Sequence, residues 1–318
     1  TDVIRIPMEE NIKYSDGCTN PDYAKRTQYS GDMIHQEALE WLDLQTKDKP
    51  FYGLFTYTLP HAELYQPNDS ILQAYYGKFC NDKTFGGTDR YHATINTHAQ
   101  FAAMITRLDA YVGEIMDKLK EKGLDDNTIL IFSSDNGPHE EGGADPDFFG
   151  RDGKLQGKKR SCHEGGIRIP FIVRWPGHVK AGSVNNHMLA FYDIMPTFCD
   201  LIGQENYIEK FGNKKVENDY FDGISFAPTL LGKDGQKEHD FLYWEFHETN
   251  QMGVRKGDWK LYVERGKCKL FNLANDIHED HDVSAQHPEV VKELVKIIYE
   301  QHTTPDVNEF KTVTLPQQ

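Results

Sequence analysis

The stretch SSDNGPHEEGG, residues 133–143, follows directly on the apolar run ILIF, residues 129–132. The apolar run predicts a buried strand, and Asp135, Asn136 and Gly137 come immediately after it. Asn-Gly is a strong turn signal, so a plain turn would explain these residues. Carboxylate and amide oxygens at the carboxyl end of a strand are also the ligands that a hard cation such as Ca²⁺ prefers. The tripeptide alone leaves both interpretations open.

Composition limits the classes of protein that the chain can belong to. Its 318 residues, 38% hydrophobic and 12% aromatic, predict a folded globular protein with one large domain, or a large and a small one. Fifty acidic side chains against 35 basic ones give a net charge of −15. This balance argues against a general nucleic-acid or anionic-membrane surface, because the attraction to phosphate would be reversed. No apolar run approaches the length of a membrane span.

Cysteine usage and the first residues say little about the cellular compartment. The five cysteines include no C-x-x-C pair, so they predict no zinc site, and an odd number cannot be wholly paired within the chain. The opening TDVIRIPMEEN lacks the pattern of a signal peptide and does not begin with Met. We therefore expect either a processed start or a piece of a longer protein.

Hydrophobic periodicity predicts alternating helices and strands in the first two thirds of the chain. A loop-like region, residues 62–91, interrupts this alternation. The pattern is typical of an α/β sheet. The predicted helices are residues 31–46, 96–122 and 192–203, and the predicted strands are residues 51–61, 127–137 and 169–177.

The pattern changes near residue 236. Short alternating strands separated by turn residues predict an antiparallel meander, and an amphipathic helix over residues 287–302 follows it. We therefore predict two domains, residues 1–235 and residues 236–318. The predicted strands are FLYWEF (241–246), MGVRKG (252–257), WKLYVERG (259–266) and KLFNL (269–273).

Polar side chains stand where the predicted strands end, which is where α/β sheets bind ligands. His61 ends one strand, and Lys158 and Lys159 lie in a glycine-rich loop that leads into another. A histidine after proline is often a surface residue, and a lysine pair in a loop is often simply solvated. Together with a cation site, however, these residues suit hydrolysis of an anionic ester. The cation neutralises charge, lysine holds a non-bridging oxygen, and histidine holds the anion or protonates the leaving oxygen.

Linked motifs in this order resemble those of the sulfatase family of the alkaline-phosphatase superfamily. They include the spacing G-x-K-x-x-x-x-E-G-G-x-R-x-P, a following WPG, and a closing run KLFNLANDIHEDHDVSAQHPE at 269–289. The resemblance covers nearly the whole chain. It implies a sulfatase-like mixed α/β sheet flanked by helices, with a smaller C-terminal antiparallel α+β domain. The main runs are KPFYGLFTYTLPHAEL (49–64), FSSDNGPHEEGGADPDFFG (132–150) and GKLQGKKRSCHEGGIRIPFIVRWPG (153–177).

The resemblance assigns roles to individual positions. Asp135 and Asn136 match two of the family's calcium ligands, and His61 matches the histidine that contacts the sulfate. Lys159, five residues before Glu164, matches the lysine that holds a sulfate oxygen, and Lys158 occupies a variable position. The remaining motif residues are expected to be structural, with the glycines allowing a tight turn. These are Glu164, Gly165, Gly166 and Arg168.

The sequence also departs from the family pattern. Sulfatases make their formylglycine nucleophile from a C/S-x-P-x-R motif, and no cysteine or serine here begins one; Cys18 is followed by TNPDY. The paired aspartates and the K-x-H element that precede the KPF strand in the family are absent as well. Two side chains cannot hold Ca²⁺, which prefers six to eight oxygens. We expect residue 1 to lie inside a longer protein whose upstream segment completes the site; the alternative is a pseudo-enzyme that lost its nucleophile.

The implied reaction is hydrolysis of a sulfate ester, on a sulfated small molecule or glycan, in an extracytoplasmic location (periplasmic, secreted or lysosomal). The chain alone is expected to be inactive. His139, His247 and Arg255 are candidate substrate residues. Two aromatic residues, Tyr243 and Trp259, suit either sugar faces or the core of the meander.

Two other functions remain open. A phosphodiesterase or phosphonate hydrolase of the same superfamily would use the same cation and lysine, and the missing nucleophile would distinguish it. A non-catalytic glycan-binding fragment is the second, and it would lack C/S-x-P-x-R at full length.

Overall fold

The structure, a computed structural model, describes residues 28–150, 153–204 and 222–317. The chain forms two compact units. The first holds Thr1–Thr128 and Pro138–Gly153, and the second holds Ile129–Gly137 and Lys154–Gln318. The domain boundary near residue 236 stays a prediction. Cys18 lies outside the described residues.

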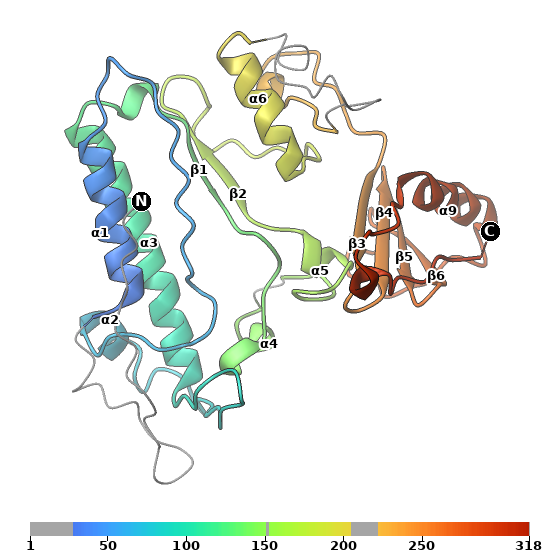
Figure 1. The fold of residues 1–318 in the computed structure, drawn as a ribbon, viewed down its shortest axis with the longest axis horizontal. Coiled ribbons are helices and arrows are strands. Elements are labelled where there is room, and N and C mark those ends of the chain that lie inside the picture. The colour runs from blue at the N-terminus through green and yellow to red at the C-terminus, as the bar shows by residue number, and fades with distance from the viewer. Residues whose placement is uncertain (1–27, 151–152, 205–221, 318) are drawn as a thin grey trace. The chain divides into compact units, whose positions relative to one another are not determined.

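Two long helices organise the first unit. Helix α1 (Ser30–Asp43) and helix α3 (Thr97–Glu121) lie side by side and confirm the predicted helices there (Figure 1). Gly123, with φ of 63°, follows the end of α3 in the left-handed conformation that glycine favours. A hydrophobic core of this unit contains Leu59, Leu64, Phe101, Met104, Tyr111 and Ala144. The short helices are α2 (Ser70–Gln73), η2 (Asp125–Asn127), η3 (Glu141–Gly143) and α4 (Pro146–Phe149).

The predicted strand over residues 51–61 was wrong. Residues 51–58 form no ladder with any described strand, and the segment ends in turn and bend geometry at residues 59–62. An aromatic, β-branched run favours a strand only where a neighbouring strand accepts its backbone hydrogen bonds. Tyr52 and Leu54 are correspondingly exposed, at 67% and 71%.

The second unit begins with a two-stranded sheet. Strand β1 (Leu130–Ser133) pairs antiparallel with β2 (Phe171–Arg174), and helix α6 (Ile194–Leu201) follows in the chain. Both strands and the helix fall within the predicted segments. The remaining short helices of this part are α5 (Glu164–Ile167), η4 (Phe191–Asp193) and α8 (Ala227–Leu230).

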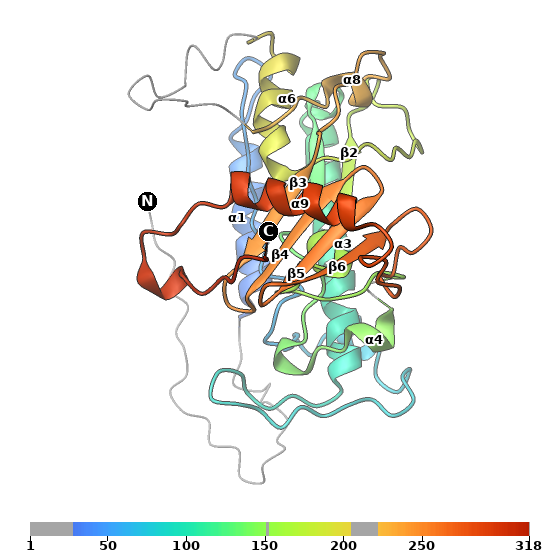
Figure 2. The ribbon, with the colours of Figure 1, turned by 90° about the vertical axis from the view of Figure 1, so that its right-hand side faces the viewer.

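The predicted meander is confirmed as a four-stranded antiparallel sheet in the order β3-β4-β5-β6. Helix α9 (Pro288–Gln301) crosses one face of this sheet (Figure 2). Leu294 and Ile298 of α9 pack against Met252 and Leu261 in its core. The strands are β3 (Leu242–Phe246), β4 (Gln251–Lys256), β5 (Trp259–Glu264) and β6 (Lys267–Asn272), and η5 (Asn308–Phe310) comes near the end.

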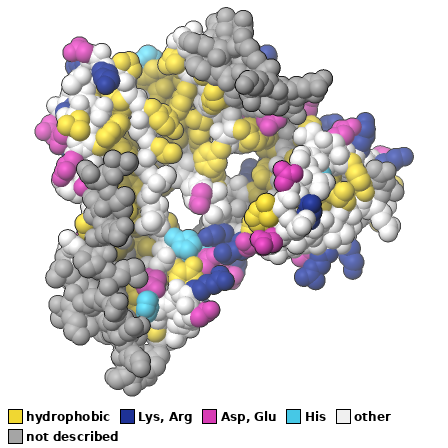
Figure 3. Space-filling view, in the orientation of Figure 1, with side chains coloured by type: hydrophobic (Ala, Val, Ile, Leu, Met, Phe, Trp, Pro, Cys, Tyr) yellow, Lys and Arg dark blue, Asp and Glu magenta, His cyan; other side chains and the backbone are white. Residues whose placement is uncertain are grey.

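Large apolar side chains remain at the surface of both units. Hydrophobic side chains are visible on the face drawn in Figure 3. No helix in the described part of the chain has the length and apolar content that a bilayer crossing needs. The large apolar side chains with more than half of their area exposed include Leu44, Tyr52, Leu54, Ile172, Val184 and Ile202.

Candidate functional site

Direct backbone contacts join the segment after β1 to the turn of α5 in the second unit. The amide of Gly137 donates to the carbonyl oxygen of Gly166 at 3.0 Å. A Cβ on Gly137 would lie 1.9 Å from the carbonyl oxygen of Gly165, closer than any real contact. Glycine is therefore required at position 137 by close approach between two backbones.

The same close packing continues into the lysine loop, the glycine-rich segment that carries Lys158 and Lys159. A Cβ on Gly166 would lie 2.6 Å from the carbonyl oxygen of Lys158, and Ser161 donates its amide to that same oxygen at 2.9 Å. The sequence predicted that Gly165 and Gly166 serve a tight turn, but neither has a positive φ. Close approach is the reason instead. The structure thus brings the segment after Asn136 and the backbone of Lys158 to the same Gly165–Gly166 turn.

Asp135 and Asn136 offer oxygen donors in a form that a hard cation can use. The Asp135 side chain is exposed, and the Asn136 side-chain amide donates to the carbonyl oxygen of Gly137 at 2.8 Å. Because the amide nitrogen is used by the backbone, the side-chain oxygen is the atom that remains for a ligand. The donor type fits Ca²⁺, and the number falls short of its usual six to eight oxygens.

A buried ion cluster ties the lysine loop to the meander sheet. Glu164 and Lys260 are both fully buried, and Lys260 Nζ lies 2.8 Å from Glu164 Oε1. Arg255 and Arg168 reach the other carboxylate oxygen at 3.4 and 3.5 Å. Burial alone would raise the pKa of Glu164, but the charge and hydrogen bond of Lys260, with the two arginines, outweigh burial and lower this pKa. Glu279 adds a further tie by accepting the Glu164 amide at 2.8 Å.

His61 and His139 meet in the first unit. Their rings stack with centroids 4.8 Å apart. The carbonyl of Ala62 lies 3.0 Å from His61 Nδ1, so this nitrogen donates and Nε2 is the acceptor of a neutral ring. His139 is buried, with Nε2 3.0 Å from the carbonyl of Pro60 and Nδ1 3.0 Å from a Glu141 carboxylate oxygen. His139 Nε2 therefore donates to Pro60, and Nδ1 is the ring nitrogen that faces Glu141.

This cluster is a second possible metal site, of a different kind. The ligand atoms of His61, His139 and Glu141 lie within 4.8 Å of one another. Two nitrogens and one oxygen suit zinc or another transition metal, whereas Ca²⁺ takes oxygen ligands.

The candidate substrate residues Arg255 and His247 do not line a common cavity in the structure. Arg255 lines a cavity of the second unit, and His247 is not among the residues that line it. The His247 ring packs edge-on against Phe310 instead, at 4.6 Å between centroids. Tyr243 and Trp259 pack against the core of the meander, which supports their structural interpretation.

Comparison with known proteins identifies the family. The model of the family Sulfatase matches residues 4–204, and that of N-sulphoglucosamine sulphohydrolase, C-terminal, matches residues 156–304. The chain belongs to the sulfatase family. Its fold is accordingly the alkaline-phosphatase-like α/β fold of that family, with an antiparallel sheet in the C-terminal region.

Several relatives show how much of a sulfatase the chain represents. It is 32% identical over 244 residues to an N-acetylgalactosamine-6-O-sulfatase of Bacteroides thetaiotaomicron, covering 67% of this chain and 45% of that protein. A crystal structure of Ps i-CgsB in complex with k-i-k-neocarrahexaose aligns with a TM-score of 0.68 and 29% identity, covering 87% of this chain and 55% of that one. The phosphonate monoester hydrolase of Agrobacterium radiobacter, at 20% identity and a TM-score of 0.60, covers 86% and 61% and shares the fold alone. The chain thus spans about half the length of the relatives it matches.

Two residues at the candidate site were missed by sequence reasoning. Glu141 follows His139 by two positions, and this spacing was the available signal for their pairing. No sequence signal pointed to Lys260, because it lies in a strand of the meander, 96 residues away from its partner Glu164 in the sequence.

Proposed function

We propose that the chain forms the sulfate-binding part of a sulfuric ester hydrolase that acts on sulfated carbohydrates. One observation carries the proposal: the Asp135-Asn136 strand end and the lysine loop are locked together by backbone contacts through Gly137 and Gly166. These are the two segments whose motifs match the family's metal and sulfate positions. Several relatives are named for sulfated sugars, including the Bacteroides enzyme, which supports a glycan as the substrate class.

Each candidate residue has a role in this reaction. In sulfatases, formylglycine supplies the attacking hydroxyl and Ca²⁺ supplies positive charge beside the sulfate. Asp135 and Asn136 would hold the cation with oxygens from other residues. Lys159 would hold a non-bridging sulfate oxygen and take up the charge that grows on it. His61 would bind the sulfate and assist departure of the leaving oxygen through Nε2, since Nδ1 donates to Ala62.

The nucleophile is proposed to come from a segment outside the given sequence, upstream in the same protein. No residue of the sequence begins a C/S-x-P-x-R motif, and the chain spans about half the length of its relatives. The exposed apolar side chains support further residues packing there, because monomeric proteins seldom leave large apolar patches open. We also propose an extracytoplasmic location, as the family resemblance implies.

The 318-residue chain by itself should not hydrolyse a sulfate ester. It has groups to attract an oxyanion but no attacking group, and positioning without a nucleophile leaves the bond intact. The purified, mass-verified chain would be assayed with a chromogenic aryl sulfate and a sulfated sugar, with and without Ca²⁺. An aryl phosphonate with the same leaving group would be assayed in parallel. Hydrolysis of the phosphonate without hydrolysis of either sulfate ester would favour the alternative function of a phosphonate hydrolase.

Sustained sulfate release by the chain, lost on Lys159→Ala, would contradict this prediction. It would show that the nucleophile lies within the given residues. If the natural full-length sequence also lacks C/S-x-P-x-R, the glycan-binding alternative would replace the enzyme.

A further inference from the structure

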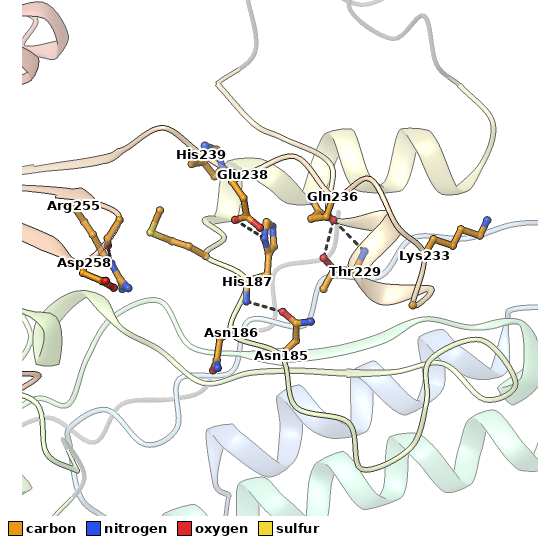
Figure 4. Close-up of a pocket in the computed structure, with 13 residues that line it drawn as sticks. Asn185, Asn186, His187, Thr229, Lys233, Gln236, Glu238, His239, Arg255 and Asp258 are labelled. Atoms are coloured by element: carbon orange, nitrogen blue, oxygen red, sulfur yellow. Dashed lines mark hydrogen bonds and ion pairs between the residues drawn. The ribbon is translucent and has the colours of Figure 1, made fainter. Parts of the chain in front are cut away.

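A polar cavity in the second unit lies apart from the candidate catalytic residues. Its volume is about 610 Å³, within the range of roughly 300–1,000 Å³ that is usual for small-molecule sites. Figure 4 shows His187 and Glu238 between Arg255 and Asp258 on one side and Gln236 with Thr229 on the other. None of the residues assigned to the sulfate or the metal lines it.

His187 is the most informative residue of the lining. Its side chain is only 4% exposed, and its Nδ1 lies 3.0 Å from Glu238 Oε2. Because the carboxylate only accepts, Nδ1 donates, and Nε2 of the neutral ring is an acceptor. Among the described residues this buried Nε2 has no hydrogen-bond partner. A buried acceptor beside a cavity is satisfied when a ligand hydroxyl donates to it.

The lining around His187 is fixed by its own hydrogen bonds. His239 Nε2 donates to the fully buried carboxylate of Asp193 at 2.9 Å, and that carboxylate also accepts the amide of Ile224 at 2.8 Å. Gln236 accepts the amide and the hydroxyl of Thr229 at 3.1 and 2.8 Å. Ligand binding therefore has to order few of these groups, which favours affinity.

The chemistry of the lining indicates a sugar. Amides (Asn185 and Asn186) and carboxylates (Glu238 and Asp258) stand beside the acceptor of His187. Such a mixture of donors and acceptors matches sugar hydroxyls, which both donate and accept.

One end of the cavity holds the guanidinium of Arg255. Arg255 contacts Glu164 at 3.4 Å, but that carboxylate is also shared with Lys260 and Arg168, so it neutralises Arg255 only in part; Asp258 lines the same end of the cavity. This end is suited to an anionic substituent on the ligand. Lys233, the other cation of the lining, extends away from the centre in Figure 4.

We propose that this cavity binds one acidic sugar unit of a glycan, with a ring hydroxyl donating to His187 Nε2 and a sulfate or carboxylate at Arg255. The site goes beyond the proposed hydrolysis, because binding here needs no nucleophile. The Arg255–Glu164 contact joins it to the α5 turn that follows the lysine loop.

Calorimetric titration of the 318-residue chain with galactose 6-sulfate tests the proposal, with galactose and inorganic sulfate as comparison probes. We expect saturable binding of galactose 6-sulfate at least about tenfold tighter than that of either comparison probe. His187→Phe keeps a ring of similar size and removes the acceptor, so it should weaken binding at least about tenfold, the size of one lost hydrogen bond. The exposed Asn186→Ala should weaken binding several-fold without risk to the core.

Two controls separate this site from the ester site. Lys237→Ala changes an exposed lysine next to the lining and should leave the affinity unchanged. The titrations are therefore run in the Lys159→Ala background, which removes the lysine proposed to hold sulfate at the ester site, and loss of all saturable binding in that background would place the sugar at the ester site and overturn the proposal. Equal binding of inorganic sulfate, equal binding of galactose, or no saturable binding at tens of millimolar would overturn it too. Melting curves for each variant confirm folding, and if His187→Phe unfolds the chain, Asn186→Ala decides.

Discussion

Lys159→Ala should lower sulfate-ester turnover by about 10²–10³-fold, which is the effect of removing one donor that stabilises transition-state charge. The measurement requires an active protein in which a segment with C/S-x-P-x-R precedes this chain. Lys159 is chosen because it stands five residues before Glu164, in the family's lysine position. Its loop is held by backbone contacts and by the buried Glu164, so removing this side chain should not unfold it.

Lys158→Ala is the matched control for this experiment. It removes the same charge from the neighbouring position, and both lysines are half-buried. We expect less than a fewfold loss, because position 158 is the variable one in the motif. Equal losses from the two variants would show that the motif has been aligned wrongly through this loop. Comparing kcat with kcat/KM would show whether the lost interaction forms mainly in the transition state.

Lys260→Met should destabilise the second unit by about 3–5 kcal/mol, as breaking a buried ion pair does. The substitution keeps most of the length of the side chain but leaves the buried Glu164 carboxylate without its 2.8 Å partner. The two arginines stay near Glu164, at longer distances, and compensate only in part. Denaturant unfolding followed by tryptophan fluorescence measures the effect, since Lys260 Nζ lies 4.8 Å from the Trp244 ring centre.

A surface lysine on the same hairpin provides the control. Lys256 pairs with Glu293 at an exposed position, so Lys256→Met should cost less than about 1 kcal/mol. Equal costs for the two variants would mean that the buried pair does not stabilise the fold as proposed.

The pH dependence of stability gives a second readout of the buried pair. The pKa of Glu164 is lower in the folded protein than its ordinary value of 4.5. The ionised carboxylate therefore stabilises the fold above pH 4.5, and this contribution is lost as the pH falls toward the lowered pKa. Lys260→Met should reduce this loss of stability at acid pH.

The elements that sequence could predict are those with strong local periodicity. Helices α1, α3 and α9 carry apolar residues at helical spacing, and the meander strands alternate between turn residues, so local pattern and final structure agree. The segment over residues 51–61 has equally strong strand composition but no partner among the described residues. A strand depends on hydrogen bonds to another segment, and local composition cannot supply that information.

The site residues also fall into two groups, those that local motifs point to and those that depend on contacts between distant segments. The motif spacing assigns roles to Asp135, Asn136 and Lys159 from short linked segments of sequence, and these assignments stay predictions. The requirement for glycine at position 137 depends on a backbone 28 residues away, and the pairing of Lys260 with Glu164 depends on a strand 96 residues away. Such contacts arise only when segments that are distant in the sequence pack together.

The most direct test is a crystal structure of the protein with Ca²⁺ and sulfate bound, in which the distance from Lys159 Nζ to the Asp135 carboxylate is measured. We predict that this distance is below about 10 Å, short enough for one sulfate and one cation to lie between them. Asp135 and Asn136 should both contact the cation, and Lys159 should contact a sulfate oxygen. A longer distance, or a sulfate and a cation bound to other residues, would contradict the assignment of this chain's sulfate and metal site.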